Sequence, residues 1–407
     1  MAMTAPSPGY RAAFATPEFG PLFTAYLLSL MGDVVAAVAL TVLVFERTGS
    51  PFLAGLTFTL AFMPSLIGGT LLSAMVERLP PRRLMVGCDL LSAAMVVAMA
   101  AGHAPVWALL TLLAALGLVS PIQNGTRNAV LGAILPGDSF VAGRSLFRVV
   151  AQSAQVVGNA TGGLLLAFAS PRGALGVDAA TFVVSALLVG FGTRARPARV
   201  RAVVRGSLLG DSLSGVRAVL AVPLLRRVLL LGWFVPALSV APESLAAASV
   251  HELGRSGTAV GLWLAALPIG VITGELAALR LFSPARRSRV VVPLAAWVFV
   301  PLLVFALEPR IELAIPPLVL SGLGHGYSLG LDTLIIRHAD GAIRDLVFTV
   351  FGAGLMAIQG LGFAAAGALA EVVSPHVAIV VAGVIGLALV ALLRPRPSAA
   401  TAHRTAA

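Results

Sequence analysis

The stretch 76–83 reads Val-Glu-Arg-Leu-Pro-Pro-Arg-Arg and lies between two long apolar segments. Its last four residues, Pro80-Pro81-Arg82-Arg83, recur 204 positions later (284 − 80) as Pro284-Ala285-Arg286-Arg287. Further matches occur at the same shift: Leu60, Ala61 and Pro64 with Leu264, Ala265 and Pro268; Gln155 and Gly158 with Gln359 and Gly362; Ser170-Pro171 with Ser374-Pro375. A fixed period usually means structural repetition. The sequence therefore predicts a duplicated fold in which this loop is the same joint in each half.

The composition places these halves in a membrane. The chain is 58% hydrophobic and 11% charged, with a mean hydropathy of +0.97. Its apolar residues form long runs: residues 19–45 contain a single charge, Asp33, and residues 51–76 contain none. About 20 apolar residues span a bilayer as a helix, and backbone groups in lipid must pair internally. These runs predict an all-α polytopic membrane protein.

Twelve apolar segments are predicted, six on each side of a polar break. The segments lie at about 19–45, 51–76, 84–102, 105–126, 145–169 and 173–193, then at about 228–248, 257–279, 290–307, 311–334, 346–370 and 374–393. They divide the chain into a tail (1–18), a first bundle (19–193), a linker (194–227), a second bundle (228–393) and a second tail (394–407). Two six-helix pseudo-repeats of the same orientation follow from this division.

The arginines fix the expected orientation. All 28 basic residues are arginine, and with twelve spans only Arg47, Arg172, Arg255 and Arg310 fall on one side. The positive-inside rule then places both termini and the linker in the cytoplasm, and the protein in the plasma (inner) membrane. Within the linker, residues 206–225 suggest an amphipathic helix on the inner surface, with an unstructured tether as the alternative.

Several classes of function are disfavoured. The arginines lie at helix ends without a basic domain or aromatic platform, which argues against nucleic acid as a partner. The single cysteine, Cys88, allows no disulfide within the chain and no cysteine metal cluster. A nucleotide-binding P-loop needs a lysine that this chain lacks. We therefore expect neither an enzyme nor a metal or cofactor.

Several stretches resemble those of a known family. Residues 73–83 are similar to the loop signature G-x-x-x-D-R-x-G-R-R of the major facilitator superfamily, with Ser73, Glu77 and Pro80 replacing Gly, Asp and Gly. Gly158-Asn159-Ala160-Thr161-Gly162-Gly163 resembles the antiporter motif G-P-x-x-G-G, with Asn159 in place of proline. Residues 32–40 and 178–182 resemble the branch of macrolide-efflux and enterobactin-exporter-like proteins. The resemblance covers nearly the whole chain.

The resemblance implies a function. It implies a secondary active transporter, a monomer, that works by alternating access and exports a hydrophobic or amphipathic small molecule, a drug or secondary metabolite, in exchange for protons. One alternative is an importer of a small solute. A second is a scaffold or sensor that has kept the fold and lost transport.

Asp33 is the candidate for proton coupling. A charge near the middle of a span costs about 2.5–3.5 kcal/mol on insertion scales, so such residues usually face a cavity and have a function. An acid that exchanges its proton for a cationic substrate would couple export to proton entry. The alternative is a structural carboxylate bonded to neighbouring helices.

Three further groups are candidates. The loop residues Glu77, Arg78, Arg82 and Arg83 would form a conformational latch, or would only fix topology. Gly158, Gly162 and Gly163 would let helices approach closely. Lining of a substrate cavity is predicted for Tyr26, Phe58, Phe62, Gln123, Gln155, Trp233, Phe234 and Gln359, with ordinary helix packing as the alternative. For Asp178 and Glu243 we expect capping or gating, and for Glu275 and Asp332 pairing with Arg280 and Arg337.

Overall fold

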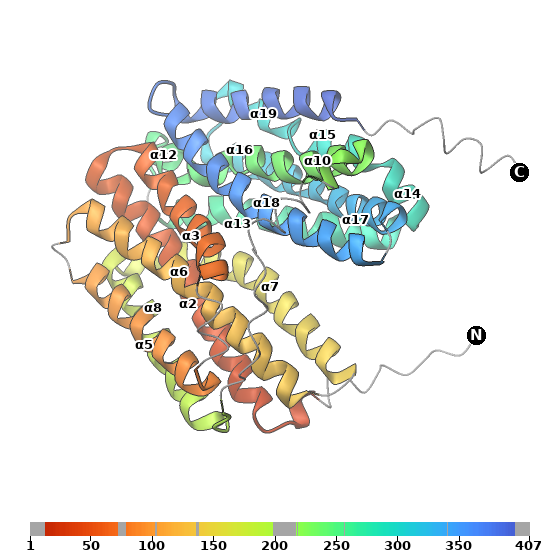
Figure 1. Ribbon diagram of the computed structural model, residues 1–407. Helices are drawn as coiled ribbons and strands as arrows, with labels where there is room; N and C mark the ends of the chain where they lie inside the picture. The colour runs from red at the N-terminus through yellow and green to blue at the C-terminus, as the bar shows by residue number, and fades with distance from the viewer. Residues whose placement is uncertain are drawn as a thin grey trace, which may run out of the picture. The chain divides into compact units, whose positions relative to one another are not determined.

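A computed structural model describes residues 13–71, 79–101, 104–135, 138–197, 217, 219–255, 257–339 and 341–394. Throughout these ranges the secondary structure is helical, without strands (Figure 1). Eight of the described helices are long and apolar enough to cross a membrane. The all-α membrane fold predicted from the apolar runs is confirmed.

The first six predicted spans are occupied by six helices. These are α2 (Phe19–Thr48), α3 (Pro51–Leu71), α5 (Pro81–Ala100), α6 (Val106–Ile134), α7 (Asp138–Phe168) and α8 (Pro171–Gly192). Proline opens α3, α5 and α8, where its missing N–H costs no hydrogen bond. At the end of α2, Gly49 takes a left-handed φ of 64° and its N–H donates to the Phe45 carbonyl.

The second set of spans is more interrupted. It comprises α10 (Pro223–Ser239), α11 (Ala241–Ser244), α12 (Ala246–Glu252), α13 (Gly257–Leu281), α14 (Pro284–Arg289), α15 (Val291–Trp297), η1 (Pro301–Leu307), α16 (Ile311–Leu323), η2 (Gly324–Gly326), α17 (Tyr327–His338), α18 (Gly341–Leu369) and α19 (Pro375–Leu392). The predicted span 311–334 is thus α16, a 3₁₀ turn and α17. Close packing explains the glycine there: a Cβ on Gly324 would lie 2.7 Å from the Val298 backbone nitrogen.

The duplication predicted from the loop is visible in the helix starts. Helix α2 begins at Phe19 and α10 at Pro223, 204 residues later, and α8 begins at Pro171 and α19 at Pro375, again 204 residues later. The remaining starts agree with the same shift within two residues: α3 with α13, α5 with α14, α6 with α16 and α7 with α18. The repeat therefore extends over all six spans of each half.

Helix capping repeats as well. The Ser170 hydroxyl accepts from the Gly173 N–H at 3.2 Å, and the Ser374 hydroxyl accepts from the Val377 N–H at 3.4 Å. In both helices proline follows the capping serine, so the matched Ser-Pro pairs are equivalent N-terminal caps. Because Ser170 caps α8, Asp178 does not have the capping role expected of it.

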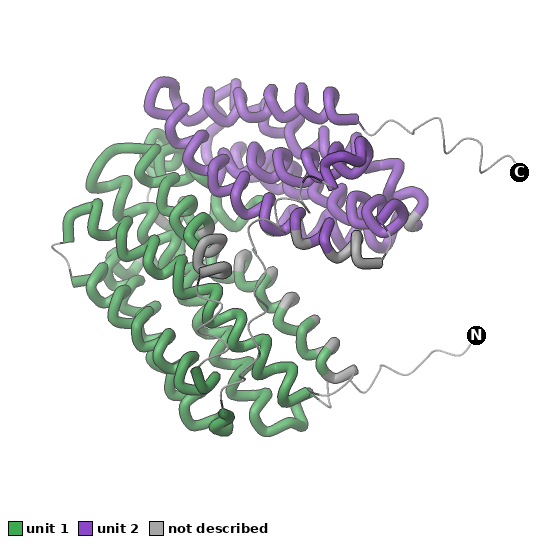
Figure 2. Tube along the Cα trace, in the orientation of Figure 1, with its two compact units in different colours: residues 1–203, 244–268 green, residues 204–243, 269–407 purple. Residues whose placement is uncertain are grey.

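The chain forms two compact units (Figure 2). Unit 1 contains residues 1–203 and 244–268, and unit 2 contains residues 204–243 and 269–407. In unit 1, α2 packs against α3, α7 and α8, and α5 packs against α6 and α8. In unit 2, α10 packs in the same way against α18 and α19. Unit 1 thus includes a short stretch of the second repeat, α12 with the first part of α13.

The start of α2 in unit 1 is fastened by one carboxylate. Glu18, just before α2, accepts two guanidinium hydrogen bonds from Arg196, both at 2.7 Å, and one from the Arg194 N–H at 2.8 Å. These donors favour the ionised carboxylate, so Arg196 above all lowers the pKa of Glu18. The first residues of the predicted linker are therefore tied to the start of α2.

Some expectations lie outside the described residues. Glu77 and Arg78 of the proposed latch are among them, as are residues 206–216 of the proposed amphipathic helix. Of the latch arginines, Arg82 is half-buried and Arg83 exposed in the first turn of α5. The latch stays a prediction.

Candidate functional site

Asp33 lies midway along α2, on the side that faces the polar residues of unit 1. Its side chain is exposed, although the residues flanking it, Gly32 and Val34, are buried. Among the described side chains it forms no hydrogen bond. Arg127 of α6 and Asp89 of α5 are close enough to interact with it electrostatically. Asp33 is therefore an accessible carboxylate within a charged neighbourhood.

Asp89, in contrast to Asp33, is a buried and hydrogen-bonded acid. It is 3% exposed, and both of its oxygens are occupied. Gln123 Nε2 of α6 donates to Oδ1 at 2.7 Å, and Ser185 Oγ of α8 donates to Oδ2 at 2.8 Å. Donors of this kind stabilise an ionised carboxylate. Asp89 thus joins three helices through the hydrogen bonds that its carboxylate accepts.

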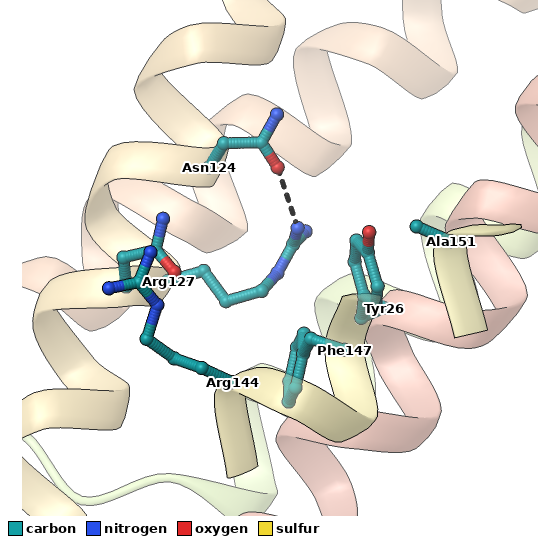
Figure 3. A pocket seen from close by; sticks show the side chains of 7 residues that line it. Tyr26, Asn124, Arg127, Arg144, Phe147 and Ala151 are labelled. Atoms are coloured by element: carbon teal, nitrogen blue, oxygen red, sulfur yellow. Dashed lines mark hydrogen bonds between the residues drawn. The ribbon is translucent and has the colours of Figure 1, made fainter. Parts of the chain in front are cut away.

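Arg127 is held in place by three kinds of contact. One guanidinium nitrogen donates to Asn124 Oδ1 at 2.9 Å, and its Cζ lies 4.4 Å from the centre of the Tyr26 ring. Figure 3 shows the guanidinium between the Asn124 amide and the Tyr26 ring. Its charge also interacts with Asp33 and Asp89. This half-buried arginine needs such compensation, because an uncompensated charge in a membrane span is costly.

A pocket of about 190 Å³ opens beside this arginine (Figure 3). Its wall includes Tyr26 and Phe147, whose rings stack with centroids 4.8 Å apart. Its polar lining comes from Asn124, Arg127 and Asn128 of α6 and from Arg144 of α7. The pocket combines an aromatic wall with a surface rich in hydrogen-bond donors and positive charge. It is suited to a molecule with a planar part and acceptor groups.

A third acid, Asp178 of α8, is packed against α2. It is 1% exposed, and its Oδ1 accepts from the Thr181 hydroxyl at 3.4 Å. A Cβ on Gly32 would clash with this carboxylate and with the Thr181 hydroxyl. Glycine at position 32 therefore allows α8 to bring Asp178 next to the backbone of α2.

The antiporter-like motif lies on the face of α7 that touches other helices. A Cβ on Gly158 would lie 2.7 Å from Val34, and one on Gly162 would lie 3.3 Å from the Val35 Cα. A Cβ on Gly163 would overlap the backbone of Gly261, and Asn159 Nδ2 donates to the Leu264 carbonyl at 2.9 Å. The motif thus packs α7 on α2 and on the start of α13.

The predicted cavity residues separate into different environments. Tyr26 lines the pocket, and Gln123 is bonded to Asp89. Phe58 is buried, and the side chains of Phe62 and Gln155 lie outside the described part of the structure. The structure therefore brings together Tyr26, Gln123 and Asp33, all in unit 1.

In unit 2, Trp233 has a packing contact, and cavity lining by Phe234 and Gln359 stays a prediction. Trp233 is 8% exposed and donates from Nε1 to the Phe351 carbonyl at 3.0 Å. Phe234 and Gln359 are half-buried in α10 and α18. Glu275 accepts from the Ser328 hydroxyl at 3.3 Å, a different partner from the Arg280 expected for it.

Sequence reasoning missed four members of the site: Asp89, Asn128, Arg144 and Phe147. For Asp89 a signal existed, because it is an acid within the apolar segment 84–102, as Asp33 is within 19–45. The other three belong to the face of α6 or α7 that meets Tyr26, which apolar runs do not reveal.

Two sequence comparisons agree on the family to which the chain is similar. A profile described as the Major Facilitator Superfamily matches residues 22–331. The multidrug efflux pump Tap of Mycolicibacterium fortuitum is 26% identical over 402 residues, which cover 93% of this chain and 96% of that protein.

Solved structures share the fold at low sequence identity. The nucleoside transporter NupG matches with a TM-score of 0.72 at 14% identity, over 92% of this chain and 98% of that one. A D-xylose–proton symporter matches with a TM-score of 0.68 at 14% identity, over 93% and 98%. A bacterial homologue of the human lysosomal transporter Spinster matches with a TM-score of 0.63 at 16% identity, over 92% and 94%.

Proposed function

The chain belongs to the Major Facilitator Superfamily, and we propose that it is a proton-coupled exporter of hydrophobic or amphipathic small molecules. It is a multi-pass membrane transporter rather than an enzyme. Export, as opposed to import, is supported by the similarity to the efflux pump Tap over nearly the whole of both chains.

The observation that carries the proton coupling is the contrast between Asp33 and Asp89. Asp89 is buried with both oxygens bonded, so a proton on either oxygen would disturb one of its two hydrogen bonds. Asp33 is exposed and is free of hydrogen bonds to the described side chains. It can take up and release a proton without breaking the packing of unit 1, and the proton and a substrate cation would compete for it.

Alternating access would convert the competition between proton and substrate at Asp33 into transport in one direction. A transporter must populate two states, and a ligand shifts their balance only through its different affinity for each. In our proposal protonated Asp33 favours the return of the empty carrier, and the substrate displaces the proton on the inner side. The glycines of α7 would let helices pack closely in one state and separate in the other.

The proposed orientation places both termini and the linker in the cytoplasm, at the inner membrane of the cell. The basis is the arginine distribution. The latch formed by Glu77, Arg78, Arg82 and Arg83 remains part of the proposal as a contact that would stabilise one state.

Flux into proteoliposomes tests this function. The purified full-length protein is reconstituted, an inside-acid pH gradient is imposed, and uptake of ethidium is followed by fluorescence. Uptake that accelerates with the gradient and stops when nigericin dissipates it supports proton exchange. Uptake that is insensitive to the gradient contradicts it. A resistance screen of cells with and without the gene would then identify substrates.

A further inference from the structure

We propose that the site in unit 1 binds two-ended substrates: amphipathic molecules with a planar ring, an amine at one end and an acidic group at the other. This inference rests on the proposed function, because it names the substrate class that would use the proton site. Its basis is the position of two exposed charged side chains, Asp33 and Arg144, and the aromatic rings between them.

The negative end is Asp33. It is accessible, and no described side chain donates a hydrogen bond to it. Its nearest positive charge is Arg127, but that guanidinium also interacts with Asp89. A substrate ammonium beside Asp33 would gain a strong attraction, because charges in a site of low dielectric interact more strongly than in water.

The positive end is Arg144. Its side chain is exposed and lines the pocket, and it forms no ion pair with the described carboxylates. Phe140 is its aromatic neighbour, with the guanidinium 5.8 Å from the ring centre. The amide of Asn128 lines the same pocket. A guanidinium that no described carboxylate pairs with is suited to bidentate binding of an acid group.

Arg127 is not the free cation of the site. Asn124 and the Tyr26 ring hold its guanidinium, which also interacts electrostatically with Asp89 and Asp33. An acid group therefore gains more from Arg144 than from Arg127. Among the described charged side chains of this site, Asp33 and Arg144 are the exposed ones, whereas Arg127 is half-buried and Asp89 and Asp178 are buried.

An aromatic wall separates the two charges. Tyr26 and Asp33 are seven residues apart, which places them on one face of α2 about 10 Å apart along the axis. The Tyr26 ring stacks on Phe147, which lies one turn from Arg144 on α7. Asp33 is not among the residues that line the pocket, so a ligand that reaches both charges must extend past the stacked rings, beyond the roughly 10 Å between Tyr26 and Asp33. A planar ring suits the aromatic wall that it passes.

The two ends would have separate tasks. The amine competes with the proton at Asp33 and so carries the exchange. The acid group at Arg144 adds affinity and selectivity without entering the proton step. A substitution of Arg144 should therefore remove the selectivity for the acid group of the substrate, while proton exchange at Asp33 is retained.

Equilibrium binding tests the two-ended site. Norfloxacin carries an amine and a carboxylate at opposite ends of a planar ring, and its ethyl ester retains only the amine. Binding of both to the full-length protein in nanodiscs is measured from the fluorescence of the ligand. The variants are Arg144→Gln and Asp33→Asn, with Arg172→Gln, an exposed arginine in the first turn of α8, as the matched control.

We expect wild type and Arg172→Gln to bind norfloxacin about tenfold more tightly than the ester, since a hydrogen-bonded charge pair gives roughly this factor. Arg144→Gln should lose this preference by weakening norfloxacin alone, and Asp33→Asn should weaken both ligands. The proposal is overturned if wild type shows no preference, including no binding of either ligand, or if Arg144→Gln retains the preference or weakens both equally.

Binding needs no proton gradient, so the two proposals can fail separately. A preference for norfloxacin together with flux that ignores the pH gradient would overturn proton-coupled export and leave the two-ended site standing. Gradient-driven flux of ethidium together with no preference in binding would do the reverse.

Discussion

Asp33 and Asp89 are both carboxylates within apolar helices of unit 1, but they differ in exposure and in hydrogen bonding. Asp89 is enclosed and bonded by Gln123 and Ser185, whereas Asp33 is open and bonded to no described side chain. Environments that separate two titratable groups in this way commonly separate their roles. We assign the fixed charge to Asp89 and the exchanged proton to Asp33.

Stability measurements should distinguish the two acids. Asp89→Ala leaves the buried Ser185 hydroxyl and the half-buried Gln123 amide without their acceptor, so we expect a loss of about 2–4 kcal/mol in unfolding free energy. Asp33→Ala removes no such bond and should cost less than about 1 kcal/mol. Thermal unfolding of the purified variants in one detergent gives the comparison. Equal losses in the two variants would contradict the assignment.

At the scale of elements, the close approach of α7 depends on glycine. A Cβ on Gly163 would overlap the Gly261 backbone, and it would push apart the two helices that Asn159 and Leu264 also join. Gly176 of α8 provides a control, because no atom lies within 4 Å of a Cβ built there.

We therefore expect Gly163→Ala to lower the transport rate at least about tenfold, and Gly176→Ala to leave it unchanged. The measurement is flux in proteoliposomes at matched protein level. If Gly163→Ala transports at the wild-type rate, the close contact of α7 with α13 has no part in the cycle.

The clamp at Glu18 joins α2 to the segment after α8. Glu18→Gln should lower the unfolding free energy by about 1–2 kcal/mol at neutral pH, because it removes a charge-assisted pair. The pKa of Glu18 is lowered from 4.5 by folding, so this stabilisation is present above the unfolded value. It is lost as the pH falls through the folded value.

Melting curves of wild type and Glu18→Gln at several pH values check the clamp. The difference in melting temperature should be present at pH 7 and should shrink below pH 4.5. A difference that stays constant across this range would mean that the carboxylate charge is not what stabilises the junction.

The elements were largely predictable from the sequence, but the site only partly. Prolines that bound the apolar runs indicate where several helices begin. Each helix start in the first half has a counterpart in the second half at the 204-residue shift, within two residues. Asp33 was identifiable because a lone acid in an apolar run is costly. The stacking of Tyr26 on Phe147 was not, since it depends on which faces of α2 and α7 meet. Trp233 was ambiguous for the same reason, because an indole that lines a cavity and one that packs two helices look alike in sequence.

At the scale of the whole molecule, the repeat and the arginine distribution together specify a topology. If each half has six spans, as the sequence predicts, the chain returns to its starting side before the linker. Reporter fusions after Ala104 and after Arg205 should therefore report opposite sides of the membrane, with the Arg205 fusion inside. Two fusions on the same side would refute twelve spans.

The central claim is that Asp33 carries the exchanged proton. Asp33→Asn removes the titratable group and keeps the shape and most of the hydrogen-bonding capacity of the side chain. We measure substrate flux in proteoliposomes with and without an imposed pH gradient, for wild type and Asp33→Asn at matched protein level. We expect the mutant to lose gradient-driven flux and to retain energy-independent exchange of substrate across the membrane. Gradient-driven flux equal to wild type in Asp33→Asn would contradict the claim.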